Sequence, residues 1–446
     1  MMKRPTLYLM MIAAMLVIMQ PGSAQQVNSF SVKQAIDYAT KNSVQVKNAL
    51  LDVLIQQQTN RDVTSIALPQ INASGNVTDY LDIPTTLLPG EIIGQPSGTF
   101  VPVKFGTKWT TNGTLTLSQL LFDGQVFIAL KARNGTMNLQ RKVEEITEEN
   151  IRANIYKIYY QLVAGKTQIE LLDANIARLQ KLAHDVKIMY DNGFTEKVDI
   201  DKLTVQLTNL ETEKQRANSM IRNGYGGLKV LMGMPVKDSL VLTDTLSDDM
   251  IRDGALATSQ YNYSDRRDYQ VLQITNKLNA LNLRRYKLSQ LPTLSFMGSY
   301  SKQAQRNTFD FFGKGDWFTT TYIGLQLRLP IFNGFAARAR IQKARLELKK
   351  TQNQQEALKN VIDNDVADAQ NNFSTAIAAM DYQKKNMALA ELVYNQTKKK
   401  YEIGTGSATE INTAQVDLKT AQTNYLTALY DAIIAKIDFL KATGKL

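Results

Sequence analysis

The chain has 446 residues, no cysteine, a single histidine and a formal net charge of +11 at pH 7. Without cysteine it can form no disulfide, no thiolate nucleophile and no cysteine-linked lipid anchor. A lone histidine, His184, excludes a multi-histidine metal site, and we expect neither a metal nor a cofactor. Because basic and acidic residues are interleaved along the predicted helices, we interpret the positive charge as solvated helix surface and expect no nucleic-acid partner.

Residues 1–24 have the composition of a secretory signal peptide. Lys3 and Arg4 form a basic head, an apolar run follows from Leu7 to Met19, and small residues end at Ala24. The apolar run is too short to span a bilayer comfortably, so we expect cleavage and export rather than a membrane anchor. No later segment is long and apolar enough for a transmembrane helix, so a membrane span would require strands closed into a barrel.

The first predicted structural repeat covers residues 25–232. It contains a helix that begins in a capping box at Ser31, a strand hairpin over 70–122 and a long helix pair over 125–232. Alternation of apolar and polar residues between Thr107 and Phe122 indicates a strand with two different faces. No proline occurs between Val103 and Met234, and a heptad seam runs from Ile155, so a helix of roughly 100 Å is expected.

The second predicted repeat covers residues 233–446. It contains an equatorial segment over 233–264, a helix, a strand hairpin over 293–330 and a long helix pair over 335–443, whose second helix is predicted to begin in a capping box at Ser407. A second heptad seam runs from Val366 to Tyr394, interrupted once, and predicts coiled-coil packing. The two inter-strand loops, 80–107 and 303–316, are predicted to face outside the cell, because the outer loops of membrane barrels are the longer ones.

The two halves match each other in a fixed order of short motifs. Leu-Pro occurs at 68–69 and 291–292, Phe-Asp-Gly at 122–124 matches Phe-Asn-Gly at 332–334, and each long helix ends in Tyr-x-x-Gly. The final glycines, Gly193 and Gly404, can adopt the left-handed backbone that ends a helix. The ordered set of matches predicts an internal tandem repeat in a fold that is mainly α with β.

Four strands per chain are too few to close a barrel, because about eight is the practical minimum. An open four-stranded sheet in lipid would leave backbone groups unsatisfied at its edges. Two copies would just reach the minimum, and three copies would give a 12-stranded transmembrane β-barrel without edges. The membrane interpretation therefore requires an oligomer.

In its doubled and ordered motifs, the chain resembles the TolC-like outer membrane efflux protein family, and the resemblance covers nearly all of the mature chain. The resemblance implies a homotrimer in which a transmembrane β-barrel continues into a long coiled-coil helical barrel in the periplasm, with a mixed belt from residues 25–65 and 233–264. It implies an outer-membrane exit duct of a tripartite efflux or type I secretion system. Its partners would be outer-membrane lipid, a periplasmic adaptor protein and an inner-membrane pump of the RND or ABC type.

The resemblance also implies where functional residues lie. The helix turns at the periplasmic end would meet the adaptor, through Asn192, Gly193 and Phe194 in one turn and Gly404, Thr405 and Gly406 in the other. The pore constriction would involve Asp199, Glu410 and, where the family often has a second acid, Thr413. Tyr401 matches a family position that bonds across neighbouring helices to the acid corresponding to Asp199. The alternative is that Asp199 and Glu410 are acids of the first helical turn, where the helix dipole stabilises a negative charge.

Two other classes of function are alternatives to the duct. A periplasmic coiled-coil adaptor or scaffold without a membrane span would use the strand segments as a small soluble sheet. An enzyme is disfavoured, because the sequence has no cysteine, one histidine, no glycine-rich phosphate loop and no convergent acid–base cluster. The cargo is open, since drug efflux, metal efflux and protein secretion would use the same kind of duct.

Overall fold

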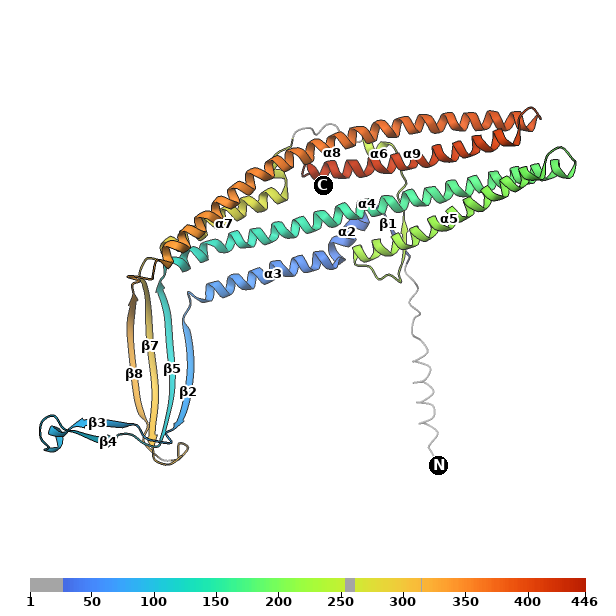
Figure 1. Ribbon diagram of the computed structural model, residues 1–446. Helices are drawn as coiled ribbons and strands as arrows, with labels where there is room; N and C mark the ends of the chain where they lie inside the picture. Colours follow the sequence, from blue (N-terminus) through green and yellow to red (C-terminus); the bar gives the residue numbers. More distant parts are fainter. Residues whose placement is uncertain (1–26, 253–260, 314) are drawn as a thin grey trace, which may run out of the picture. The chain divides into compact units, whose positions relative to one another are not determined.

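The computed structural model describes residues 27–252, 261–313 and 315–446. The predicted signal peptide, residues 1–24, lies outside the described residues, as does part of the predicted equatorial segment, 253–260. The chain divides into two compact units. The first takes Met1–Leu51, Lys142–Val271 and Glu356–Leu446, and the second takes Asp52–Arg141 and Leu272–Gln355. Each unit therefore combines segments from both predicted repeats (Figure 1).

The second unit contains a four-stranded antiparallel sheet. Its strands are β2 (Gln70–Asp79), β5 (Trp109–Phe122), β7 (Thr293–Arg306) and β8 (Phe318–Arg328), in the order β2-β5-β7-β8 (Figure 1). Strands β5 and β7 pair over nearly their whole length, so the two predicted hairpins join into one sheet. In this sheet β2 and β8 are the edge strands.

The predicted loop after β2 contains a further hairpin, which the sequence did not predict. Strands β3 (Thr85–Pro89) and β4 (Phe100–Lys104) pair antiparallel, with the short 3-10 helix η1 (Gly90–Ile93) between them. Three prolines in this stretch removed the usual strand signal, because proline donates no backbone hydrogen bond.

Four helical segments of the second unit form a layer in the same order as the strands. Helix α3 (Val44–Ser65) leads into β2, β5 leads into α4 (Gly124–Asp191), α7 (Arg267–Leu288) leads into β7, and α8 (Ala336–Glu402) follows β8. The Asn60 amide of α3 donates to the Arg133 carbonyl of α4 at 3.0 Å, and Asn279 of α7 donates to Thr351 of α8 at 2.7 Å. A Cβ at Gly135 would lie 2.7 Å from the Leu278 side chain, so glycine permits the close approach of α4 and α7.

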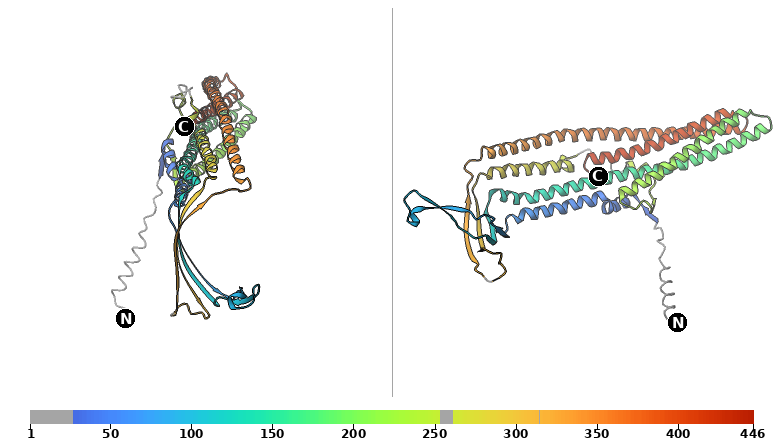
Figure 2. Two further views of the ribbon diagram at one scale, coloured as in Figure 1. Left: turned by 90° about the vertical axis from the view of Figure 1, so that its left-hand side faces the viewer. Right: turned by 60° about the horizontal axis from the view of Figure 1, so that its bottom comes forward.

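The first unit is built mainly from two antiparallel helix pairs, which Figure 2 shows from two further directions. Helix α4 pairs with α5 (Lys197–Met232), and α8 pairs with α9 (Ala408–Ala442). The predicted seams are buried: Ile155 and Val186 of α4 and Met380 of α8 are each 0% exposed. Each such side chain contributes roughly 1.5–3 kcal/mol by burial, so the seams supply much of the unit's stability.

A small mixed region completes the first unit. Strand β1 (Val27–Phe30) pairs in parallel with β6 (Ser239–Leu242). Helix α2 (Val32–Asn42) follows β1 in the chain, and the short helices α6 (Asp249–Arg252) and η2 (Tyr263–Asp265) follow β6. The buried Tyr159 hydroxyl of α4 donates to the Phe30 carbonyl at 2.8 Å and accepts from the Asp244 amide at 3.2 Å. Strands of four residues are too short to show alternation, so the sequence did not predict this ladder.

Both predicted capping boxes are present. The Ser31 hydroxyl accepts from the Gln34 amide at the start of α2, and the Ser407 hydroxyl accepts from the Glu410 amide at the start of α9. In each case the side chain three residues on also accepts from the cap backbone. Two otherwise unpaired amides are satisfied at each helix start.

Candidate functional site

The two turns that join the long helices have the same backbone geometry. In the first turn the Gly193 amide donates to Tyr190 and the Phe194 amide donates to Met189. In the second turn the Gly404 amide donates to Tyr401 and the Thr405 amide donates to Lys400. This pair of bonds is the Schellman arrangement, and it needs a left-handed residue; φ is 79° at Gly193 and 77° at Gly404.

The two turns present exposed side chains of different chemistry. Phe194 is 79% exposed in the first turn and Ile403 is 74% exposed in the second. The Asn192 side chain donates to the Ile188 carbonyl at 2.7 Å and helps to end α4. A Cβ on Gly406 would lie 2.9 Å from the Tyr401 nitrogen, so this glycine is required by the close approach of the turn to α8. Each turn thus offers one exposed apolar side chain on a fixed backbone.

The hydroxyl of Tyr401 points to a different partner from the one that the resemblance implied. It donates to the sulfur of Met189 at 3.2 Å, whereas Asp199 accepts from the Thr195 hydroxyl at 2.9 Å and lies 3.4 Å from the Lys202 ammonium. Burial raises the pKa of Tyr401, and the carboxylates of Asp185 and Asp199 raise it further. Tyr401 is therefore a protonated donor at neutral pH that lies near Asp199 without bonding to it within the chain.

Glu410 and Thr413 lie on one exposed stripe of α9. The Glu410 carboxylate accepts from the Ser407 amide at 3.4 Å, and the Thr413 hydroxyl donates to the Thr409 carbonyl at 3.0 Å. Asp417 is also exposed and follows Glu410 by seven residues, which places it on the same stripe. The sequence analysis did not single out Asp417, and the signal that identifies it is its heptad spacing from Glu410.

An apolar cluster directly behind the turns holds the two helix pairs together. Its buried members come from α4, α5, α8 and α9: Leu179, Leu182, Val186, Leu203, Tyr394, Ile411, Ala414 and Leu418. Polar contacts continue the interface, since Asn175 donates to Gln422 at 3.1 Å and the Lys419 ammonium lies 2.7 Å from Glu213. The turns are therefore fixed relative to each other by packing within one unit.

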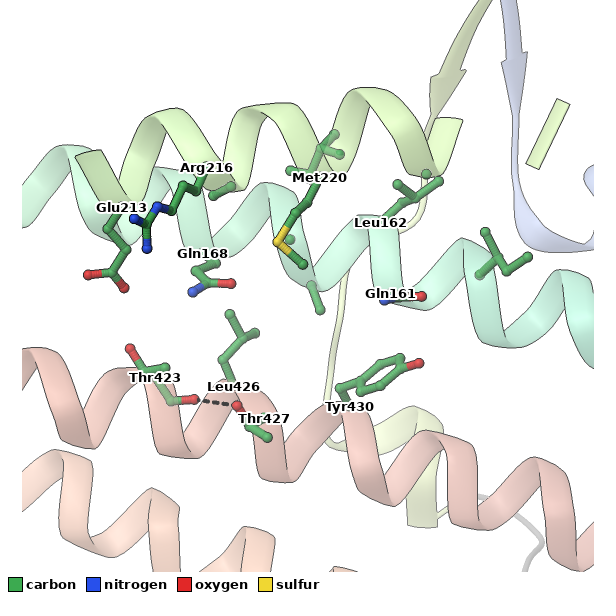
Figure 3. Close-up of a pocket in the computed structure, with 16 residues that line it drawn as sticks. Gln161, Leu162, Gln168, Glu213, Arg216, Met220, Thr423, Leu426, Thr427 and Tyr430 are labelled. Carbon is green, nitrogen blue, oxygen red and sulfur yellow. Dashed lines mark hydrogen bonds between the residues drawn. The ribbon is translucent and has the colours of Figure 1, made fainter. Parts of the chain in front are cut away.

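A cavity of about 430 Å³ lies between α4, α5 and α9 (Figure 3). Met220 extends into it from α5, Leu426 lines it from α9, and Gln168, Arg216 and Tyr430 supply polar groups around it. The Glu213 carboxylate at its border is paired with Lys419. The lining can hold an apolar side chain of a neighbouring helix.

The sheet of the second unit has one apolar and one polar face. Residues directly opposite each other on neighbouring strands share a face, and the observed register aligns Ile71, Leu117, Gly298 and Ile323 in one row. The next row on the other face aligns Asn72, Thr116, Ser299 and Tyr322. The sequence predicted the alternation within each strand, and the register brings the apolar positions of all four strands to one face, which also carries a polar row at Lys302 and Thr319.

Strand β8 is exposed along its entire length on both faces. Ile323, Leu325 and Leu327 are 76%, 69% and 68% exposed. Apolar side chains at this level of exposure mark a surface that contacts something other than water. Within residues 27–252, 261–313 and 315–446, no helix is both long enough and apolar enough to cross a membrane.

Known proteins with similar sequences are outer membrane proteins. Residues 286–445 match the family model described as outer membrane efflux protein. The outer membrane efflux protein BepC of Brucella suis is 21% identical over 437 residues, which cover 95% of this chain and 87% of BepC. The outer membrane protein TolC of Vibrio cholerae is 18% identical over 333 residues, 74% of this chain and 76% of TolC.

The fold agrees with a solved structure over almost the whole chain. The crystal structure of the outer membrane protein VceC from Vibrio cholerae superposes with a TM-score of 0.72, at 15% sequence identity, covering 93% of this chain and 96% of VceC. The family-model match, the relatives and the fold agree: the chain is similar to TolC-like outer membrane efflux proteins.

Proposed function

We propose that this chain is the outer-membrane exit duct of a tripartite efflux or type I secretion system. Three copies would form a 12-stranded barrel in the membrane and a helical barrel in the periplasm. The duct is passive and has no catalytic step, and the energy comes from an inner-membrane pump of the RND or ABC type acting through a periplasmic adaptor.

The observation that carries this proposal is the sheet of the second unit. Its apolar face is exposed on β8, and among the described residues no further strand lies beside its two edges, β2 and β8. A water-soluble sheet would bury such a face against a second layer. Lipid on the apolar face and a neighbouring copy at each edge satisfy both requirements, so the scaffold without a membrane span is disfavoured.

The edges of the helical layer support the same arrangement. Helices α3 and α8 are the two outer helices of the layer. Helix α3 exposes Leu51, Leu54 and Ile55, and α8 exposes Leu346. Apolar side chains of neighbouring copies can cover one another where α3 of one copy meets α8 of the next. The order of helices then repeats around the trimer as the order of strands does.

We assign gating and adaptor docking to the helix turns. Glu410, Asp417 and Thr413 would line the constriction, where three copies of each carboxylate attract cations. Asp199 and Tyr401 would stabilise the closed state, with Asp199 moving between its Thr195 bond and the Tyr401 hydroxyl. The exposed Phe194 and Ile403 fit apolar pockets of an adaptor, with Asn192, Gly193, Gly404, Thr405 and Gly406 setting the shape of the surface.

Reconstitution in a neutral bilayer tests the proposal. The mature protein, purified in detergent and added to a phosphatidylcholine planar bilayer, is expected to give stable stepwise conductance, since a closed barrel leaves an aqueous path. Extraction without detergent as a soluble protein, together with no conductance, would support the scaffold function instead.

A further inference from the structure

The positive charge of the chain is concentrated in one part of the fold. The helical segments of the second unit, 52–65, 124–141, 272–288 and 336–355, contain fourteen lysines and arginines and three acidic residues. Their net charge of +11 equals that of the entire chain, so the rest of the protein is balanced. These segments are the ones that directly precede or follow the strands of the sheet.

Two helices of the layer each carry one exposed stripe. On α4 the exposed positions recur at 127, 131, 134, 138 and 141, and on α7 they recur at 277, 280, 284 and 287. Steps of three and four residues keep a stripe on one side of a helix. Every charged residue in these two stripes is basic: Lys131, Arg141, Lys277, Arg284 and Lys287.

Both stripes lie on the same side of the layer. On α4, Asn134 is exposed, the next residue, Gly135, faces α7, and Thr136 bonds to α3 on the other side. On α7 the order is the same: Lys277 is exposed, Leu278 faces the neighbouring helix α4, and Asn279 bonds to α8 on the other side. The two helices run antiparallel, so they are related by a twofold axis perpendicular to the layer. Rotation about this axis exchanges the two helices but does not exchange the two sides of the layer. Because the order of exposed and packed residues is the same on both helices, both exposed stripes lie on the same side.

An aromatic contact connects this side to the apolar face of the sheet. Phe122 at the end of β5 is opposite Leu294, and Leu294 is opposite Leu327, so Phe122 belongs to the apolar face. The ring of Phe122 packs on that of Phe127, the first residue of the α4 stripe, at 5.7 Å. Along one side of the second unit the surface thus changes from apolar to aromatic to basic.

We propose that the exposed residues Lys131, Arg284 and Lys287, the basic collar, bind the anionic headgroups of phospholipids in the membrane leaflet nearest the helices. The inference rests on the proposed membrane span. Lys131 lies about 10 Å along α4 from its first residue, and Arg284 lies about 6 Å from the end of α7, at about 1.5 Å per residue. The headgroup layer extends about 5–7 Å beyond the hydrocarbon core, so basic side chains at these distances can place their charges in it while their alkyl stems follow the apolar surface.

The position of the collar favours phospholipid over a polyanion in the lumen. The collar continues the apolar face, which contacts lipid in the proposed barrel, whereas the lumen would be lined by the opposite face with its asparagine, serine and threonine residues. An aromatic residue between an apolar band and basic residues is the usual order at a membrane–water boundary. Basic groups just outside a bilayer attract anionic lipids at short range.

Lipid preference of the full mature protein tests the collar. Native mass spectrometry of the trimer in an equimolar mixture of phosphatidylglycerol and phosphatidylcholine is expected to show preferential retention of phosphatidylglycerol. Replacing the collar in the triple variant Lys131→Gln, Arg284→Gln, Lys287→Gln is expected to lower that preference at least about tenfold. The charge-conserving variant Lys131→Arg, Arg284→Lys, Lys287→Arg should keep it.

A matched control separates the collar from total charge. The variant Lys166→Gln, Lys181→Gln, Lys187→Gln removes three exposed lysines of the same helix α4 within the first unit, and it should keep the preference. Equal loss in both glutamine variants, or no loss in either, would overturn the collar. A changed ion selectivity in the collar variant with lipid preference retained would place the collar in the lumen and also overturn it.

Flotation with neutral vesicles separates this proposal from the proposed function. If the wild-type protein floats with phosphatidylcholine vesicles but shows no preference for phosphatidylglycerol, only the collar fails. If it does not associate with phosphatidylcholine vesicles at all, the proposed membrane span fails.

Discussion

Gly193 and Gly404 lie in the turns directly after the two long helices, two residues beyond the helix ends. Both have a positive φ, and a Cβ at either position would meet no atom within 4 Å. Space is therefore not what requires glycine there; the left-handed backbone is. This local requirement could be predicted from the sequence, because the two Tyr-x-x-Gly motifs mark a helix end and a turn without any knowledge of what surrounds them.

Replacing Gly404 by alanine is expected to destabilise the second turn by about 1–2 kcal/mol, because a Cβ is unfavourable in the left-handed region. Hydrogen exchange of the amides around Gly404 should become faster while trimer assembly is unchanged, and efflux should fall if the turn contacts the adaptor. Gly227→Ala is the matched control, since Gly227 lies inside α5 with open space around it and alanine favours helix by about 1 kcal/mol. Unchanged exchange at Gly404→Ala would contradict the backbone argument.

The charge of Glu410 is expected to set ion selectivity at the constriction. Glu410→Gln removes the charge but keeps an oxygen that can accept from the Ser407 amide, so the helix cap survives. The cation-to-anion permeability ratio in planar bilayers should fall, and adding Asp417→Asn should lower it further. Glu170→Gln, an exposed acid on α4, is the control; an equal effect there would remove the pore assignment.

At the scale of elements, the register of the sheet decides which side chains share a face. The sequence showed that each strand alternates, but it could not show that β5 pairs with β7 and so combines two hairpins into one amphipathic sheet. The missing information is long-range, because residues 109–122 and 293–306 are far apart in the chain. The same limit applied to the parallel pairing of β1 with β6 and to the contact of Tyr401 with Met189.

Neighbouring positions on β8 are expected to respond differently to a charge. Leu325 lies on the apolar face and Gln326 on the polar face of the same strand. Leu325→Lys should lower the stability of the membrane-inserted protein by about 2–4 kcal/mol, whereas Gln326→Lys should change it little. Denaturant unfolding of both variants from phosphatidylcholine vesicles measures the difference. Equal tolerance at the two positions would show that neither face contacts lipid.

For the molecule as a whole, the proposed membrane span requires neighbouring copies at the exposed edges of the sheet. Strands β2 and β8 are separated in one chain by two other strands, which places them about 14 Å apart at the usual spacing between strands. A short bifunctional reagent cannot link them within one copy, but it can link β2 of one copy to β8 of the next in a closed barrel.

Cross-linking can therefore count the copies. The chain has no cysteine, so the double variant Ser74→Cys, Tyr322→Cys carries the sole thiols, both on the polar face. Treatment with a bismaleimide about 8 Å long should give a covalent trimer on a denaturing gel, because three copies are expected to close the barrel. Each single variant should stay monomeric. A product that stops at the covalent dimer would contradict closure by three copies.

The sequence by itself determined the long helices, their turns, the capping boxes and the alternation of each strand. Those features depend on the absence of proline, on single glycines and on spacings within a few residues, so they are encoded locally. Only the tertiary structure decided the order of strands and helices, the common face of the sheet and the side of the layer on which Lys131, Arg284 and Lys287 lie. These depend on which distant surfaces pack together, and a local pattern such as the heptad seam of α4 is compatible with several partners.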